Sequence, residues 1–143
     1  DRGLGDFFTF TGRASDDLLL DMLNTADICV NPDRVTPMND LSTMNKILEY
    51  MTLQKPIVQF EMKEGRESAG EASLYARPGD VVDFAEKIAM LLDDPALRET
   101  MGQIGRQRIL ERFSWDHSAP QLLAAYDRAF AKMGRHRETT SSR

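Results

Sequence analysis

Residues 26–60 read ADICVNPDRVTPMNDLSTMNKILEYMTLQKPIVQF, and this stretch decides the fold class. The short apolar run at 28–30 ends at Asn31-Pro32, which is typical of a strand that is covered on both faces. After a polar loop, apolar residues follow at i, i+3, i+4 and i+7, the spacing of one helix face. They are Met44, Ile47, Leu48 and Met51. Residues 56–60 then predict a second strand, so the stretch forms a parallel β-α-β unit.

The flanking sequence adds strands to this unit. The run FFTFT at residues 7–11 is rich in residues that favour strands and is closed by Gly12. Residues 73–76 predict a weaker strand that ends before Pro78-Gly79. Because strands and helices alternate, we expect an α/β fold: a Rossmann-like parallel sheet of about four strands with flanking helices.

Four further helices are predicted from their caps and apolar spacing. They begin after Ser15, Asp80, Asp94 and Ser114. Pro120 interrupts the last of them, so we expect a kink or a late start near Ser118. Residues 134–143 are polar and are expected to be disordered, which leaves 1–133 as the domain and makes its C-terminal part helical.

The composition of the chain excludes several functional classes. Its 143 residues suffice for one domain with a substantial core, and their net charge is −5. This acidic balance is poor for binding nucleic-acid phosphates. One cysteine and two distant histidines cannot build a zinc cluster, and no apolar run has the length of a membrane span. A lone Cys29 is expected to be a buried core residue of a cytoplasmic protein.

The polar face of the helix at 44–51 is the candidate site. Because this helix follows a strand end, its free amides and positive dipole face the crevice in which such sheets bind ligands. An anion such as a diphosphate would fit there, and the Glu49 carboxylate could accept hydrogen bonds from a ribose diol. The plain alternative is a solvated face with a Lys46–Glu49 pair three residues apart. Neither a P-loop nor a Gly-x-Gly-x-x-Gly motif is present.

Five separated motifs resemble one family. The main one is Leu48-Glu49-Tyr50-Met51, followed by Lys55-Pro56-Ile57-Val58; the others are residues 8–12, residues 26–32, Phe113-Ser114-Trp115 and Ala125-Tyr126. Together they resemble the retaining, GT-B-fold glycosyltransferases of group 1. The resemblance implies part of the donor-binding domain of a two-domain enzyme that transfers a sugar from a nucleotide-sugar with retention and without a metal or other cofactor, for instance in polysaccharide biosynthesis.

The same resemblance implies roles for individual residues. Glu49 matches the second glutamate of the family's paired-glutamate motif and would bind the donor ribose. The first glutamate falls at Leu41, so the neighbouring Asp40 is the candidate to replace it, and Glu49 and Asp40 are the catalytic candidates. The other donor-binding candidates are Gly12 and Arg13 beside the base, the amides of Ser42, Thr43 and Met44 on the diphosphate, and Lys46.

The resemblance also places essential parts outside these residues. The family's paired basic residues and its acceptor-binding N-terminal domain lie upstream, so the expected partners are the nucleotide-sugar donor and that missing domain. In the family's strand order, two strands lie between the segments at 7–11 and 28–30. We therefore expect residues 1–143 to be an incomplete folding unit, inactive alone and capable of self-association. The intact protein would lie in the cytoplasm, or at the inner membrane face through the missing domain.

Two other classes of function are weighed against this one. A non-catalytic nucleotide-sugar-binding or interaction module of the same fold is the main alternative, because fold does not fix function. A receiver-type signalling domain would need acids clustered at adjacent strand ends, and Asp27 and Asp33 supply no convincing cluster.

The remaining polar and aromatic residues receive plainer interpretations. Lys63, Arg66 and Ser68 follow a strand end and are weaker candidates for contact with the sugar or phosphates. The other expectations are a solvated basic flank for Arg106, Arg108 and Arg112, a polar helix start for His117, a place in the tail for His136, and packing roles for Trp115 and Tyr126.

Overall fold

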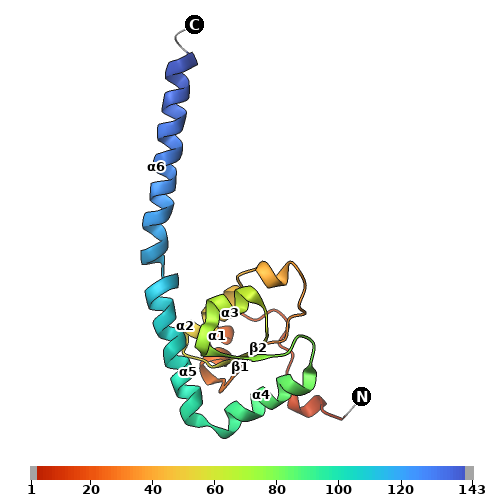
Figure 1. The fold of residues 1–143 in the computed structure, drawn as a ribbon. Helices are drawn as coiled ribbons and strands as arrows, with labels where there is room; N and C mark the ends of the chain where they lie inside the picture. Colours follow the sequence, from red (N-terminus) through yellow and green to blue (C-terminus); the bar gives the residue numbers. More distant parts are fainter. Residues whose placement is uncertain (1–2, 141–143) are drawn as a thin grey trace.

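The computed structural model describes residues 3–140, with side chains described up to residue 132. Three parallel strands form its sheet in the order β1-β2-β3: β1 (Cys29–Asn31), β2 (Ile57–Phe60) and β3 (Ser73–Ala76) (Figure 1). The register places Asn31 opposite Gln59 and Gln59 opposite Tyr75 at the carboxyl ends of the strands. The α/β class and the parallel sheet are thus confirmed, with three strands in place of about four.

The helices connect and cover these strands. They are α1 (Asp16–Thr25), α2 (Asn45–Thr52), α3 (Lys63–Ala69), α4 (Val81–Asp93), α5 (Pro95–Arg108) and α6 (Trp115–Thr140). Short 3-10 turns lie at Gly5–Phe7, Asn39–Leu41 and Gly70–Ala72, and a π-helical segment, Ile109–Phe113, joins α5 to α6. The side chains of Ser15, Asp80 and Asp94 accept the predicted capping hydrogen bonds from the first turns of α1, α4 and α5.

The prediction of a strand at residues 7–11 is wrong. Phe7 ends a 3-10 turn, residues 8–11 lie outside the sheet, and Phe7, Phe8 and Phe10 are exposed. A strand needs a neighbour to bond its backbone, and among the described residues β1 pairs only with β2. High strand propensity alone therefore did not make these residues a strand. The segment does not lie against β1, so β1 keeps an open edge within the described part of the chain.

Two apolar clusters fill the two faces of the sheet. Ile57 of β2 packs on one face against Ile47 and Met51 of α2, with α3 and the end of α5 completing the cluster. Val58 and Phe60 point to the opposite face and pack against α4. Buried Cys29 lies on the α2 side, and burial raises the pKa of its thiol to about 11, which agrees with the expected core role.

Arginines of α5 bind the carboxyl ends of three helices. Arg98 donates to the carbonyls of Leu91 and Leu92 at the end of α4, and Arg106 donates to the Thr52 carbonyl of α2. Arg108 donates to the carbonyls of Glu67 and Ser68 in α3. Arg112, in the π-helical segment, pairs with the Glu67 carboxylate. The prediction of a merely solvated flank for Arg106, Arg108 and Arg112 is therefore wrong. Arg106 and Arg108 bind terminal carbonyls, which lack partners within their helices and attract cations, and Arg112 binds a carboxylate.

The α6 helix extends away from the sheet (Figure 1). Its apolar residues face outward among the described residues: Trp115, Leu122, Leu123, Tyr126 and Phe130 are all exposed. The predicted packing roles of Trp115 and Tyr126 are thus not realised within the described part of the chain. The helix begins at Trp115 and contains Pro120, so the alternative of a late start is wrong. Its backbone continues to Thr140 through most of the expected tail, and the side chain of His136 lies outside the described part. Within that part, no helix combines the length and apolar character needed to cross a bilayer.

Candidate donor-binding site

The loop after β1 and the helix that follows it carry most of the candidate residues. Asp33, just beyond β1, forms an ion pair of 2.6 Å with Lys46 in the first turn of α2. Each of these two side chains is about one-third exposed. The anticipated alternative, a Lys46–Glu49 pair, is therefore replaced by a contact that closes the loop 32–44 across its base. This contact leaves Glu49 on the exposed side of α2.

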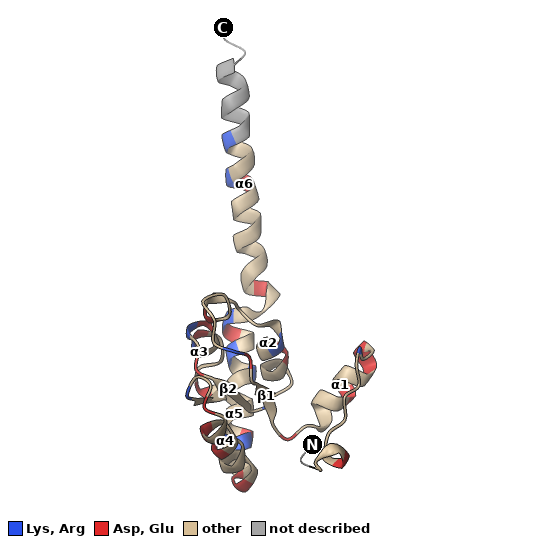
Figure 2. Ribbon diagram, turned by 90° about the vertical axis from the view of Figure 1, so that its right-hand side faces the viewer, with Lys and Arg blue, Asp and Glu red and all other residues tan. Residues whose placement is uncertain are grey.

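Glu49 lines a cleft of about 510 Å³ between α1 and α2. The residues contributed by α1 are Asp16, Leu19, Leu20 and Leu23, and those from α2 and its end are Asn45, Leu48, Glu49, Thr52 and Leu53. The wall from α1 is therefore apolar apart from the Asp16 carboxylate at its start. The wall from α2 is mixed and presents an amide (Asn45) and a carboxylate (Glu49) one helical turn apart. Figure 2 shows α1 standing off from the body of the molecule, and none of its residues is buried.

The candidates Gly12 and Arg13 lie at the start of α1. Gly12 has φ +65°, a left-handed conformation that glycine adopts without strain. Ser15 then caps the helix, and Asp16 in its first turn lines the cleft. Both Gly12 and Arg13 are exposed and near this end of the cleft in sequence, but neither lines it.

The segment Ser42-Thr43-Met44 lies before α2 and is not its first turn. Residues 39–41 form a 3-10 turn, Ser42 and Met44 have extended backbones, and α2 begins at Asn45. The Ser42 hydroxyl donates to the Met38 carbonyl at 2.6 Å and closes the preceding turn, and the helix predicted at 44–51 accordingly begins at Asn45. No side chain caps α2. The Ile47 amide donates to the Met44 carbonyl at 2.9 Å, so an anion would meet the two amides before it, those of Asn45 and Lys46.

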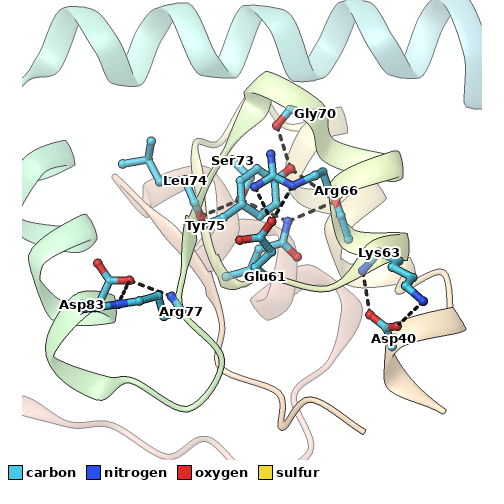
Figure 3. A network of polar contacts seen from close by, with 12 residues as sticks. Asp40, Glu61, Lys63, Arg66, Gly70, Ser73, Leu74, Tyr75, Arg77 and Asp83 are labelled. Carbon is cyan, nitrogen blue, oxygen red and sulfur yellow. Dashed lines mark hydrogen bonds and ion pairs between the residues drawn. The ribbon is translucent and has the colours of Figure 1, made fainter. Parts of the chain in front are cut away.

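Asp40 is engaged with α3. Its Oδ1 accepts a hydrogen bond of 2.8 Å from the backbone N–H of Lys63, and its Oδ2 lies 3.6 Å from Lys63 Nζ (Figure 3). The Asp40 side chain is only 24% exposed. Leu41, at the position of the family's first glutamate, is 73% exposed. The structure thus brings Asp40 to a helix start and does not bring it together with Glu49 in the cleft.

Arg66 belongs to a network of its own around Tyr75 (Figure 3). Its guanidinium donates to Glu61 Oε1 at 2.8 and 3.0 Å and lies 4.2 Å from the centroid of the Tyr75 ring. Tyr75 donates to the Gly70 carbonyl at 2.7 Å. Burial raises the pKa of Tyr75 to about 12, although the nearby Arg66 and Arg108 charges oppose this rise. These contacts occupy Arg66, while Ser68, in the last turn of α3, is buried.

Two buried amides at the carboxyl ends of the strands were missed in the sequence. Asn31 and Gln59 are fully buried, and both side-chain polar atoms of Asn31 lack a hydrogen-bond partner among the described residues, as does Gln59 Oε1. Gln59 Nε2 donates to Ser73 Oγ at 3.1 Å. The sequence offered one weak signal, a polar residue inside each otherwise apolar strand.

Comparison with known proteins places this geometry in a family. A family model described as "Glycosyl transferases group 1" matches residues 1–94. The chain is 28% identical over 127 residues to an alpha-D-kanosaminyltransferase from Streptomyces kanamyceticus, covering 87% of this chain and 32% of the relative. It is also 28% identical over 134 residues to an MMP alpha-(1->4)-mannosyltransferase from Mycolicibacterium hassiacum, covering 92% of this chain and 31% of the relative.

A solved structure gives the same answer at the level of the fold. The chain superposes on sucrose-phosphate synthase from Thermosynechococcus elongatus with a TM-score of 0.80 and 28% identity, over 90% of this chain and 32% of that one. The parallel sheet and its helices are therefore those of a glycosyltransferase domain of GT-B type. The chain belongs to the group 1 glycosyltransferase family, and it spans about a third of the length of the relatives it matches.

Proposed function

We propose that residues 1–133 form the donor-binding part of an enzyme that transfers a sugar from a nucleotide-sugar to an acceptor with retention of configuration. The observation that carries this proposal is the exposed Glu49 carboxylate in the cleft between α1 and α2. The relatives, named as sugar transferases, support the class of reaction. The chain spans only part of their length. We therefore place the acceptor site and the remaining catalytic groups outside residues 1–143.

The cleft suits a nucleoside in size and lining. Its volume of about 510 Å³ lies within the usual range of roughly 300–1,000 Å³ for small-molecule sites. In the proposed complex, the base packs against Leu19 and Leu23 on the apolar wall of α1. The ribose hydroxyls then donate to Glu49, and Asn45, one turn earlier on the same helix, is placed to bond the ribose or the first phosphate. Gly12 and Arg13 flank the base from the start of α1.

The start of α2 suits the diphosphate. Its first amides have no side-chain cap, and the positive end of a helix dipole favours an anion. Lys46 adds a positive charge in the first turn, although its pairing with Asp33 at 2.6 Å offsets part of that charge. Thr43 and Met44 would contribute backbone amides just before the helix, whereas the Ser42 amide already donates to the Asn39 carbonyl at 3.3 Å. These groups would stabilise the negative charge that develops on the leaving diphosphate, which is the main source of rate in such a transfer.

Calorimetric titration of residues 1–143 with UDP, GDP and ADP tests the proposal. Glu49→Ala should weaken binding of the preferred nucleotide by about 1.5–3 kcal/mol, since a charged hydrogen-bond acceptor to the ligand is lost. That range corresponds to a decrease of roughly 10- to 150-fold in affinity. Glu86→Ala is the matched control, because Glu86 is an exposed glutamate on α4, outside the cleft.

Two results would contradict the proposal. Equal affinities of Glu49→Ala and the unchanged chain would return Glu49 to the role of a surface residue. If the unchanged chain bound none of the three nucleotides, the cleft would be excluded as a donor site. Nucleotide binding by a longer protein that shows no sugar transfer would instead favour the alternative of a non-catalytic binding module.

A further inference from the structure

We propose that Asp40 and Glu64 are positioning residues, which together hold the segment Ser42-Thr43-Met44 against α3. This latch fixes the backbone amides ahead of α2 in place for a diphosphate. The inference rests on the proposed donor site, and it assigns Asp40 to the support of the phosphate-binding amides instead of direct contact with the sugar. Glu64, in the first turn of α3, was singled out by neither the sequence motifs nor the family comparison.

The first half of the latch is a helix cap supplied from a distant part of the chain. Met62, the residue before α3, provides no side-chain cap. The Asp40 carboxylate takes this role from 23 residues away by accepting from the Lys63 N–H at 2.8 Å. Its negative charge also suits the positive end of the helix. Asp40 follows directly after Asn39 in the 3-10 turn, so the cap fixes the position of the turn that precedes Ser42.

The second half of the latch joins the same two segments at the next residue of α3, Glu64. Thr43 Oγ1 donates to Glu64 Oε1 at 2.6 Å, and the buried Ser68 hydroxyl donates to the same oxygen at 3.3 Å. Ser68 thereby holds the Glu64 carboxylate in the orientation that Thr43 needs. With contacts at Asp40 and Thr43, the extended segment is attached to α3 on both sides of Ser42.

The α3 helix is itself held firmly, so the latch has a fixed support. Gly65 lies directly over Gln59: a Cβ atom added at Gly65 would be 2.6 Å from Gln59 Oε1. At the other end of α3, Arg108 donates to the Glu67 carbonyl at 2.7 Å and to the Ser68 carbonyl at 3.1 Å. The sheet and α5 thus fix α3, and α3 fixes the segment that carries the Thr43 and Met44 amides.

The charges around Asp40 also favour a positioning role over direct contact with the diphosphate. A free carboxylate beside a diphosphate would repel it, whereas Asp40 has Lys63 Nζ 3.6 Å from one oxygen and the Lys63 amide on the other. Holding a neighbouring backbone segment uses the Asp40 hydrogen-bond acceptor and needs no net charge. Asparagine should therefore replace Asp40 in a latch, and it should not replace a catalytic or ligand-binding carboxylate.

The test compares Asp40→Asn with Asp40→Ala in residues 1–143, using two probes: the preferred nucleoside diphosphate and its parent nucleoside. Asp40→Ala should lower the affinity for the diphosphate roughly tenfold, because the phosphate-binding amides move. It should leave the affinity for the nucleoside within about twofold. Asp40→Asn should remain within about twofold of the unchanged chain for both probes. A general loss of structure would lower the affinity for both probes together.

Amide hydrogen exchange gives a readout that does not depend on ligand binding. Asp40→Ala should speed exchange of the Lys63 amide, and Asp40→Asn should keep it protected. For the second contact, Thr43→Val should weaken binding of the diphosphate, whereas Thr43→Ser should preserve it. These two variants still test the latch if Asp40→Ala fails to fold. Unchanged Lys63 exchange in Asp40→Ala, or equal losses in Asp40→Asn and Asp40→Ala, would overturn the latch. If the unchanged chain bound no nucleotide, the proposed function would fail, while Lys63 exchange would still judge the contact itself.

Discussion

Gly102→Ala should destabilise the chain through a single close contact. Gly102 lies in α5 where this helix crosses the end of α2, and a Cβ added there would be 2.2 Å from the Gln54 carbonyl oxygen. That distance is about 1.2 Å short of the 3.4 Å at which ordinary contacts begin. The Gln54 backbone cannot easily retreat. The amides of Leu53, Gln54 and Lys55 donate to the carbonyls of Glu49, Met51 and Tyr50, respectively, and close the end of α2.

The expected magnitude is the difference between two opposing effects. Overpacking costs about 1–3 kcal/mol, and a contact with backbone belongs at the upper end of that range. Alanine in place of glycine inside a helix returns about 1 kcal/mol. We expect a net destabilisation of about 2 kcal/mol, and α5 to move away from Met51, which packs beneath the neighbouring Gly105.

Urea denaturation followed by circular dichroism measures this effect. A slope of about 1–3 kcal/mol per molar urea converts the expected loss into a decrease of the midpoint by roughly 1 M. Gly5→Ala is the matched control, since a Cβ there meets nothing within 4 Å, and it should stay within about 0.5 kcal/mol. Equal or greater stability of Gly102→Ala would refute the close approach of α5 to the end of α2.

Three further predictions concern the same chain. Gln54 has φ +57° at the end of α2, so Gln54→Gly should raise the free energy of unfolding by about 1 kcal/mol in urea titration; a loss would show that the Gln54 side chain contributes more than its backbone strain costs. The Arg77 amide donates to Asp83 at 2.7 Å and lowers the pKa of that carboxyl below its ordinary value of 3.8. The stabilisation from ionised Asp83 is therefore present above that value and lost as the pH falls below it. Asp83→Asn should flatten the decline of the urea midpoint between about pH 5 and pH 3. An unchanged slope would exclude this contribution. Exposed apolar residues on α1 and α6 and the open edge of β1 predict that residues 1–143 self-associate, with a weight-average mass in sedimentation equilibrium that rises with concentration; a constant monomer mass would contradict this.

The central β-α-β unit could be predicted because its local and long-range requirements agree. Residues 56–60 and 73–76 became β2 and β3 nearly as expected. Their apolar or β-favouring residues have neighbouring strands to bond and helices to cover them. The cap positions at Ser15, Asp80 and Asp94 were equally visible, since a helix cap depends on a few adjacent residues.

The failures arose where a residue's role depends on a distant partner. The aromatic run at 7–11 has strand propensity but no strand beside it among the described residues. Arg108 was interpreted as solvated because its helix-capping role depends on where α3 ends, 40 residues earlier. Asp40 was assigned to the donor by motif position, whereas its contact with Lys63 follows from the placement of α3. Glu49 and its exposed helix face were predictable from the apolar spacing of α2 alone.

The most direct test of the donor-site account is a crystal structure of residues 1–143 with the preferred nucleoside diphosphate. The account predicts that the base and ribose occupy the cleft between α1 and α2. A ribose hydroxyl should lie within roughly 3.2 Å of a Glu49 carboxylate oxygen, and the diphosphate should lie at the uncapped start of α2. A nucleotide bound elsewhere, for example in the hollow formed by Arg34, Phe60 and Gly79, with no contact to Glu49, would contradict it.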